Sequence, residues 1–319
     1  MTLPIGGYFS LELHQGLDFH SEALKLNTGR NCLEYILRCR EYQKVYLPRY
    51  ICEVVLEPFT KLGISYEFYS INYQFELTDS IYLKEGEALL YVNYWGIKQE
   101  YVKDLACQYG EHLIVDNTQA FFCPPIQGID TYYTCRKFFG VADGAYLYTS
   151  KKLKLQLPKD LSYERMGFLM KRIDLSPEAG YQDFRKESAM LVNNDIKEMS
   201  NLTDALMHSI DYQDVAQRRR ANFMTLHQRL NASNRLKFDF GDDMVPMIYP
   251  YLNSKSDLRE HLIQQKIFVA KYWPNVSQWA KDNSVESDFV NHLIAIPIDQ
   301  RYGKEEMEYI ISRILQSNG

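Results

Sequence analysis

The sequence predicts an α/β protein, with a large domain built on a mainly parallel β-sheet and a smaller α/β domain at the C-terminus. Short apolar runs alternate with helical segments over roughly the first 150 residues, which is typical of βαβ units. The strand signal fades over residues 151–200, which are charged and irregular, and a second, shorter alternation follows. Because 319 residues exceed the usual size of one hydrophobic core, we expect two domains, 1–205 and 206–319.

The elements expected in the large domain follow one another between glycine turns. The turn at 26–30 opens a first helix, whose apolar residues recur at 33, 36 and 37, one face of a helix. Glycines close the next two helices. The later elements are expected as a strand at 44–48, a helix at 52–62, a strand at 64–71, a strand that runs into a turn over 87–96, a helix at 99–109, a strand over 112–119 that ends on polar residues, and strands at 129–135 and 144–149.

The C-terminal half begins with helical apolar spacing over 199–230, with a break near Asp211. Strand and helix patterns then alternate again, without an internal repeat. They are expected as a strand at 244–252, a helix at 258–274, a strand at 292–298 and a helix at 304–315.

Composition excludes several classes of protein. With 46% hydrophobic and 24% charged residues the chain is an ordinary globular one, and no apolar run approaches the roughly 18 residues that span a bilayer. The N-terminus lacks the basic start and apolar block of a signal peptide, so a cytosolic protein is expected. The net charge of -5 gives no general attraction for nucleic acid.

The cysteines do not indicate a metal or a disulfide framework. All six lie in the first half of the chain, without a CxxC pair and without a histidine at zinc-site spacing. We therefore predict a reduced compartment and no metal.

Three unusual segments are expected at the carboxyl ends of strands, where ligands bind in open parallel sheets. They are NTGRN at 27–31, VDNTQAF at 115–121 and TCRKFF at 134–139. The backbone N–H groups of Gly29, Arg30 and Asn31, at a helix start, suit a phosphate, and the Arg30 guanidinium adds a permanent charge. An ordinary turn with a surface arginine is an equally good interpretation of that segment alone.

Asp116 and Lys137 complete a chemically coherent set. A buried carboxylate needs a cationic or hydrogen-bonding partner, and a protonated pyridine nitrogen is one. Apolar surroundings and the adjacent Arg136 would lower the pKa of Lys137 and free its amine for Schiff-base chemistry. Alone, Lys137 would more often be a surface lysine lying over Phe138 and Phe139. Phosphate cradle, carboxylate and activated lysine together describe a site for pyridoxal phosphate (PLP).

These motifs resemble those of the DegT-type sugar aminotransferases, which are PLP enzymes of the aspartate aminotransferase-like fold. TGRNCL at 28–33 is similar to the family's SGTxAL phosphate loop, and DNTQA at 116–120 to its DAAQA segment. Lys137 follows Asp116 by 21 positions, close to the family's spacing, and GAYLYT at 144–149 resembles the strand after the lysine. The resemblance covers most of the chain.

The resemblance assigns further roles. It implies that Asp116 pairs with the pyridine nitrogen, that Gln119 approaches the ring hydroxyl, and that Thr134 binds the phosphate. The residue that stacks on the ring is Tyr50 or Cys52: strict register favours Cys52, and we predict Tyr50 for its aromatic face.

The resemblance also implies a homodimer whose partner contributes a group near the phosphate, with Asn193 and Asn194 as candidates. The chain departs from the family pattern in having Arg30 for a threonine, and in the frame TCRKFF around the lysine. YWP at 272–274 is expected to serve core or domain-interface packing, with substrate contact as the lesser alternative.

The function implied is transfer of an amino group, with glutamate as donor, to a nucleotide-linked keto sugar, in surface-polysaccharide or amino-sugar biosynthesis. Two alternatives stay open. A related PLP sugar dehydratase is disfavoured by the lysine, because that branch usually has histidine there. A non-catalytic binding or regulatory relative is kept open by the altered phosphate loop.

Overall fold

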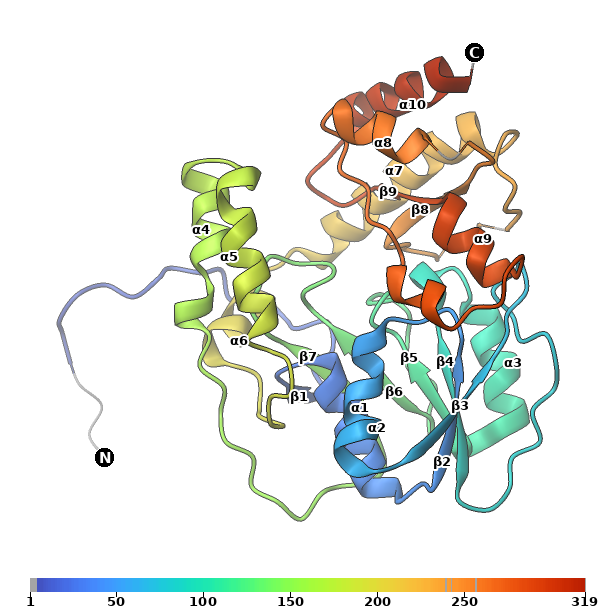
Figure 1. The fold of residues 1–319 in the computed structure, drawn as a ribbon. Coiled ribbons are helices and arrows are strands. Elements are labelled where there is room, and N and C mark those ends of the chain that lie inside the picture. Colours follow the sequence, from blue (N-terminus) through green and yellow to red (C-terminus); the bar gives the residue numbers. More distant parts are fainter. Residues whose placement is uncertain (1–4, 239, 242, 256, 319) are drawn as a thin grey trace.

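The computed structural model describes residues 5–238, 240–241, 243–255 and 257–318. Its main feature is a seven-stranded sheet in the order β1-β7-β6-β5-β4-β2-β3 (Figure 1). Neighbouring strands from β3 across to β6 run parallel, and β7 pairs antiparallel with both β6 and β1. The strands are β1 (Leu24–Leu26), β2 (Lys44–Pro48), β3 (Ser65–Tyr69), β4 (Glu87–Val92), β5 (Leu113–Asp116), β6 (Asp130–Thr134) and β7 (Ala145–Tyr148). The predicted mainly parallel α/β fold is therefore confirmed.

The helices of the first half lie close to where the sequence pattern put them. Helix α1 (Gly29–Arg40) begins earlier than its apolar spacing indicated, because the Thr28 side chain caps its first turn by accepting from the N–H of Asn31. It packs against β6 and β7. The segment expected as one helix at 52–62 is a 3₁₀ turn (Glu53–Leu56) followed by α2 (Glu57–Leu62), which Gly63 closes with a positive φ. Helix α3 (Gln99–Tyr109) packs against β5.

Residues 151–200 contain a helical hairpin that the sequence pattern did not indicate. Helices α4 (Gly167–Asp174) and α5 (Pro177–Ala189) pack on each other and project beside the sheet (Figure 1). A Cβ at Gly180 would lie 2.6 Å from the backbone oxygen of Phe168, so only glycine permits this close approach. The hairpin was missed because its two helices bury only Gly180 and Glu187 fully, and so lack a strong apolar stripe.

The C-terminal half forms a second, smaller layer. Helices α6 (Asn201–His208) and α7 (Tyr212–Leu230) are separated at Asp211, as predicted, because the Asp211 side chain caps α7. Strands β8 (Ile248–Leu252) and β9 (Leu293–Pro297) pair antiparallel. Helix α8 (Leu258–Gln264) and helix α10 (Lys304–Asn318) accompany them, and α9 (Val285–His292) is an element the sequence pattern did not indicate.

Two clusters of buried apolar side chains underlie these layers. One follows the seven-stranded sheet, and the other joins α7, α8 and α10 to β8 and β9. The division predicted between residues 205 and 206 falls within α6. Within the described part of the chain, no helix combines the length and apolar character needed to cross a membrane.

We expect Gly144→Ala to destabilise the hairpin between β6 and β7, which carries Lys137. Gly144 has φ +107°, and an added Cβ would lie 2.8 Å from Cγ2 of Thr203 and 2.9 Å from Sγ of Cys135. Strain and overpacking together should lower the free energy of unfolding by about 2–4 kcal/mol, measured by urea denaturation. Gly128→Ala is the matched control, because Gly128 has φ +84° with nothing within 4 Å of an added Cβ. Equal losses in the two variants would contradict the crowding argument.

Candidate active site

A cavity of about 270 Å³ lies where the segments after β2, β5 and β6 meet the start of α1. Six of the residues predicted for the site, or weighed for it, line this cavity together with Lys137: Gly29, Arg30, Cys52, Asp116, Gln119 and Thr134. Residues separated by more than 100 positions thus meet at one edge of the sheet. Parallel strands explain this, because their carboxyl ends share an edge.

Lys137 presents its amine inside this cavity. Its Nζ donates a hydrogen bond to Oγ1 of Thr118, at 2.8 Å. Solvent reaches the side chain through the cavity, although protein surrounds the amine. The lysine begins the turn after β6, in which the carbonyl of Cys135 accepts from the N–H groups of Phe138 and Phe139. The turn therefore fixes the direction of the lysine.

Burial lowers the pKa of Lys137 from its usual value near 10.5. Asp116 and Cys52 oppose this shift by favouring the charged ammonium. The apolar setting therefore acts as predicted, but the expected contribution of Arg136 does not appear among the groups that act on Lys137. The burial and the two acidic groups therefore act on the amine in opposite directions, and burial is the larger effect.

Asp116 is held at the end of β5 by its own loop. Its Oδ1 accepts a hydrogen bond of 2.8 Å from the backbone N–H of Thr118, and the carboxylate is buried. The pKa of Tyr132 lies well above its usual value, mainly because the side chain is buried and secondly because of the charge of Asp116. The Tyr132 hydroxyl therefore keeps its proton and donates toward the carboxylate. Asp116 and Tyr132 both line the cavity, so this network forms part of its wall.

Gln119 is fully buried and lines the same cavity. Its Oε1 accepts from the backbone N–H of Trp95 at 3.2 Å, while its Nε2 has no hydrogen-bond partner among the described residues. A buried amide without an acceptor is costly, and such groups usually meet a water or a ligand. Gln119 therefore keeps one buried, unused donor at the edge of the cavity.

The expected phosphate end is only partly as predicted. Gly29, Arg30 and Thr134 line the cavity, and a Cβ at Gly29 would lie 3.1 Å from Cγ2 of Thr118 and 3.9 Å from Cβ of Thr134. The absence of a side chain at Gly29 therefore leaves room for a ligand. Asn31 does not line the cavity: Thr28 accepts from its backbone N–H, and its side chain donates to the carbonyl of Asn194.

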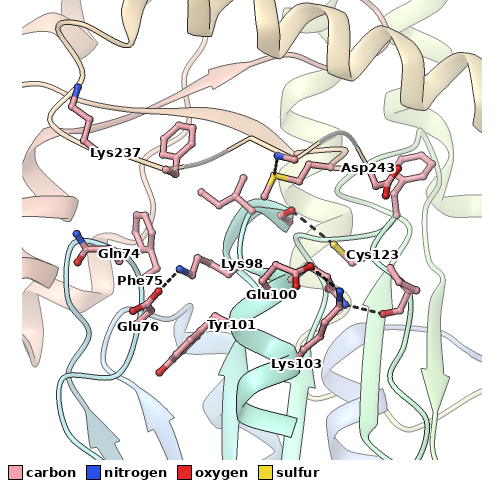
Figure 2. Close-up of a pocket in the computed structure, with 18 of the residues that line it drawn as sticks. Gln74, Phe75, Glu76, Lys98, Glu100, Tyr101, Lys103, Cys123, Lys237 and Asp243 are labelled. Carbon is pink, nitrogen blue, oxygen red and sulfur yellow. Dashed lines mark hydrogen bonds and ion pairs between the residues drawn. The ribbon is translucent and has the colours of Figure 1, made fainter. Parts of the chain in front are cut away.

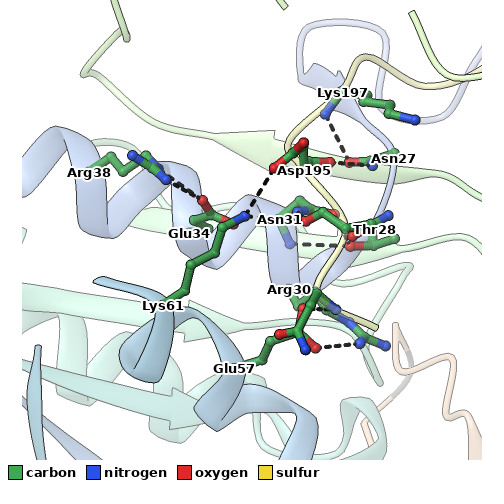
Figure 3. A network of polar contacts seen from close by, with 12 residues as sticks. Asn27, Thr28, Arg30, Asn31, Glu34, Arg38, Glu57, Lys61, Asp195 and Lys197 are labelled. Carbon is green, nitrogen blue, oxygen red and sulfur yellow. Dashed lines mark hydrogen bonds and ion pairs between the residues drawn. The ribbon is translucent and has the colours of Figure 1, made fainter. Parts of the chain in front are cut away.

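The Arg30 guanidinium forms an ion pair with the carboxylate of Glu57. Its Nη1 lies 2.7 Å from Oε2 of Glu57, as Figure 3 shows. The other oxygen of Glu57 accepts from the backbone N–H of Asn193. Asn193 and Asn194 therefore lie against α1 and α2 of their own chain. Their expected contribution to a partner's site stays a prediction.

Tyr50 lies behind the cavity wall and does not line it. Its ring is fully buried against Tyr94, Trp273 and Phe289, and its hydroxyl donates to the carbonyl of Tyr272. Cys52 and Trp273 line the cavity instead. The structure therefore does not put Tyr50, which we preferred, at the cavity wall: the chain after β2 is irregular, and its course brings Ile51 and Cys52 to the wall while the Tyr50 ring packs into the core.

Three further residues of the site drew little or no attention in the sequence. Thr118 receives the Lys137 hydrogen bond, Tyr132 supports Asp116, and Trp273 closes one side of the cavity. Thr118 lies within DNTQA, so its spacing from Asp116 was a usable signal. Trp273 comes from a segment far along the chain, for which packing was expected and substrate contact was the lesser alternative.

Another cavity, of about 560 Å³, lies away from this chemistry (Figure 2). It contains neither Lys137 nor Asp116. Its lysines are largely paired: Lys98 lies 2.6 Å from Glu76, and Lys103 lies 2.7 Å from Glu100. Its charges therefore satisfy one another, and its larger volume does not make it the better candidate.

No protein-family model and no curated protein matches the sequence. Solved structures do. A DegT DnrJ EryC1 StrS aminotransferase from Brucella abortus has a TM-score of 0.62 at 13% identity, over 93% of this chain and 86% of that one. DesV from S. venezuelae, solved with a ketimine intermediate, has a TM-score of 0.66 at 16% identity, over 92% and 84%.

A sugar dehydratase shares the fold as well. GDP-4-keto-6-deoxymannose-3-dehydratase, solved as a mutant with bound GDP-perosamine, has a TM-score of 0.64 at 13% identity, over 92% of this chain and 88% of that one. At sequence identities this low, the structural similarity establishes the fold alone. The chain therefore has the aspartate aminotransferase-like fold that the DegT-type sugar aminotransferases and this dehydratase share.

Proposed function

We propose that this protein is a PLP-dependent aminotransferase that transfers an amino group from glutamate to a nucleotide-linked keto sugar, in surface-polysaccharide or amino-sugar biosynthesis. One observation carries the proposal. The Lys137 amine and the Asp116 carboxylate line one cavity and are joined through Thr118, with hydrogen bonds of 2.8 Å on each side. The fold shared with sugar aminotransferases supports it.

The residues of the cavity fit the cofactor. The unpartnered Nε2 of Gln119 offers a donor to the ring hydroxyl oxygen, and Asp116 offers a charge to the ring nitrogen. Gly29 leaves room for the phosphate, with Thr134 and Arg30 beside it. Cys52 or Trp273 would cover a face of the ring.

Each of these residues has a part in the proposed reaction. When bound, pyridoxal phosphate supplies an aldehyde that accepts amines and a ring that withdraws electrons. Lys137 would hold the aldehyde carbon covalently and, once released from it, would carry a proton on Nζ between the substrate carbon and the cofactor carbon. Asp116 would keep a proton on the ring nitrogen, and the lowered pKa of Lys137 favours the neutral amine that both tasks need.

The homodimer and the cytoplasmic location belong to the same proposal. The N-terminal segment extends away from the rest of the molecule and exposes Ile5, Tyr8 and Phe9 (Figure 1). Exposed apolar side chains of this kind support association with another chain. The cytoplasmic location rests on the sequence alone.

The similarity in fold to a sugar dehydratase is what supports the dehydratase alternative. Retention of Lys137 speaks against it, since the resemblance implies histidine at this position in that branch. The altered phosphate loop keeps a non-catalytic binding protein as the other alternative, because Arg30 is engaged with Glu57.

Incubation with pyridoxal phosphate, ¹⁵N-glutamate and a panel of nucleotide-linked keto sugars tests the proposal. We expect a yellow protein and one amino sugar that carries ¹⁵N, detected by mass spectrometry. Production of a deoxy sugar without ¹⁵N would indicate the dehydratase instead. A colourless protein that takes up no cofactor would refute both enzymatic functions.

A further inference from the structure

A further cavity, of about 490 Å³ and distinct from the one in Figure 2, adjoins the proposed cofactor cavity and is called the second cavity below. The two share Arg136, Lys137 and Phe184 in their walls. On one side of the second cavity lie α4 and α5, and on the other lie α7 and the loop between β9 and α10 (Figure 1). A molecule in this cavity therefore lies next to Lys137 and beside the cofactor cavity.

The lining of this second cavity is strongly cationic. Four arginines from separate segments line it: Arg136, Arg172, Arg219 and Arg301. Among the described residues that form this cavity, Asp299 is the sole carboxylate. The Asp299 carboxylate accepts two hydrogen bonds from Arg301, from Nε at 2.6 Å and from Nη2 at 2.9 Å. Arg219 is satisfied by Gln300 and by the carbonyls of Pro246 and Met247. Within the described part of the chain, Arg136 and Arg172 form no ion pair within 4 Å.

Arg136 is the cation closest to the chemistry, because it precedes Lys137. Its one hydrogen bond to a described residue goes from Nη2 to Oγ of Ser188, at 3.1 Å. A guanidinium has five N–H donors, so most of those of Arg136 have no hydrogen-bond partner among the described residues. Burial and the charges of Arg30 and Arg165 lower the pKa of Arg136, while the charges of Glu187 and Asp143 oppose this shift. This crowding of positive charge is relieved by an anion.

The guanidinium lies in the wall that the two cavities share, and its side-chain contacts are with helix α5. It lies 5.9 Å from the centre of the Phe184 ring and bonds Ser188, and both residues belong to α5. Gly29 and Thr134, which would meet the cofactor phosphate, belong to α1 and β6. Arg136 is therefore left for a group that enters beside the cofactor.

We infer that Arg136 is the anion receptor for the substrate, and that the second cavity is the substrate subsite; this inference rests on the proposed function. The anion is an oxyanion with two oxygens that match a guanidinium fork, either a carboxylate of the amino donor or a phosphate of the nucleotide-linked sugar. Phe138, Phe139 and Phe168 give the same cavity apolar walls for the rest of the substrate.

Binding measurements on the cofactor-loaded protein test the inference. Uridine diphosphate and glutarate serve as probes for phosphate and carboxylate, titrated calorimetrically into the wild type, Arg136→Gln, Arg136→Lys and Arg185→Gln. Arg185 is the matched control, because it is exposed on the same helix α5 and lies outside the cavity. We expect Arg136→Gln to weaken one probe tenfold or more, Arg136→Lys to recover part of the loss, and Arg185→Gln to bind as the wild type does.

The probe that loses affinity identifies the anion, and either outcome supports the inference. Unchanged affinity for both probes in Arg136→Gln would overturn it, as would failure of both to bind the wild type. Loss of cofactor from Arg136→Gln, measured as the mass fixed by borohydride, would assign Arg136 to the cofactor phosphate and also overturn it. Wild-type protein that takes up no cofactor but binds a probe through Arg136 would refute the proposed function and leave the anion receptor standing.

Discussion

Lys137→Ala is expected to abolish the half-reaction in which glutamate gives its amino group to the bound cofactor. The substitution removes both the amine that holds the cofactor and the base that moves the proton, and a general base alone contributes about 10²–10⁴-fold. We therefore expect the rate of this half-reaction to fall by more than about 10⁴-fold, measured by the change in cofactor absorbance. Borohydride should fix the cofactor's mass to the peptide with Lys137 in the wild type and leave the variant without it.

Lys154→Ala is the matched control for this experiment, because Lys154 is exposed and remote from the cavity. Circular dichroism checks that Lys137→Ala folds, since the substitution removes the hydrogen bond to Thr118. Turnover of the alanine variant at the wild-type rate, or fixation of the cofactor on another lysine, would refute the assignment.

Asp116→Asn is expected to lower the rate by about 10²–10³-fold, as loss of one preorganised electrostatic contact does. The amide has nearly the same shape and its oxygen can still accept from the N–H of Thr118, so the loop after β5 is kept. What is lost is the negative charge that would hold a proton at the ring nitrogen. Stopped-flow measurement of the glutamate half-reaction gives the rate.

The same substitution removes a group that favours the ammonium form of Lys137. The pKa of Lys137 should therefore fall further in Asp116→Asn, and the rate of cofactor uptake should reach its plateau at a lower pH than in the wild type. Asp104→Asn, on the exposed side of α3, is the control with the same change of charge. A rate within about threefold of the wild type would contradict the role of Asp116.

The linear order of the large domain was predictable because each element has a local signal. The strand 44–48 and the helix closed by Gly110 follow from apolar runs and glycine stops, and both match the structure. The hairpin of α4 and α5 was not predictable in this way. Its helices bury little, so charge and exposure masked their periodicity.

The candidate site was predicted in part. Lys137 and Asp116 were proposed from their expected surroundings and Gln119 from the family resemblance, and the structure brings all three to one cavity. Asn31 was included for the position of its backbone N–H, which the Thr28 cap instead takes up. A capping bond depends on the rotamer of one side chain, and sequence position does not determine it.

By itself, the sequence determined which residues carry the proposed chemistry and the order of the strands that present them, because both depend on short-range patterns. Only the tertiary structure decided that Cys52 and Trp273, not Tyr50, line the cavity, and that Arg136 faces a second cavity under α5. Those outcomes depend on which way a side chain points after a strand ends, and on packing between segments far apart in the chain. Contacts of that range are set by the whole fold, and no local pattern encodes them.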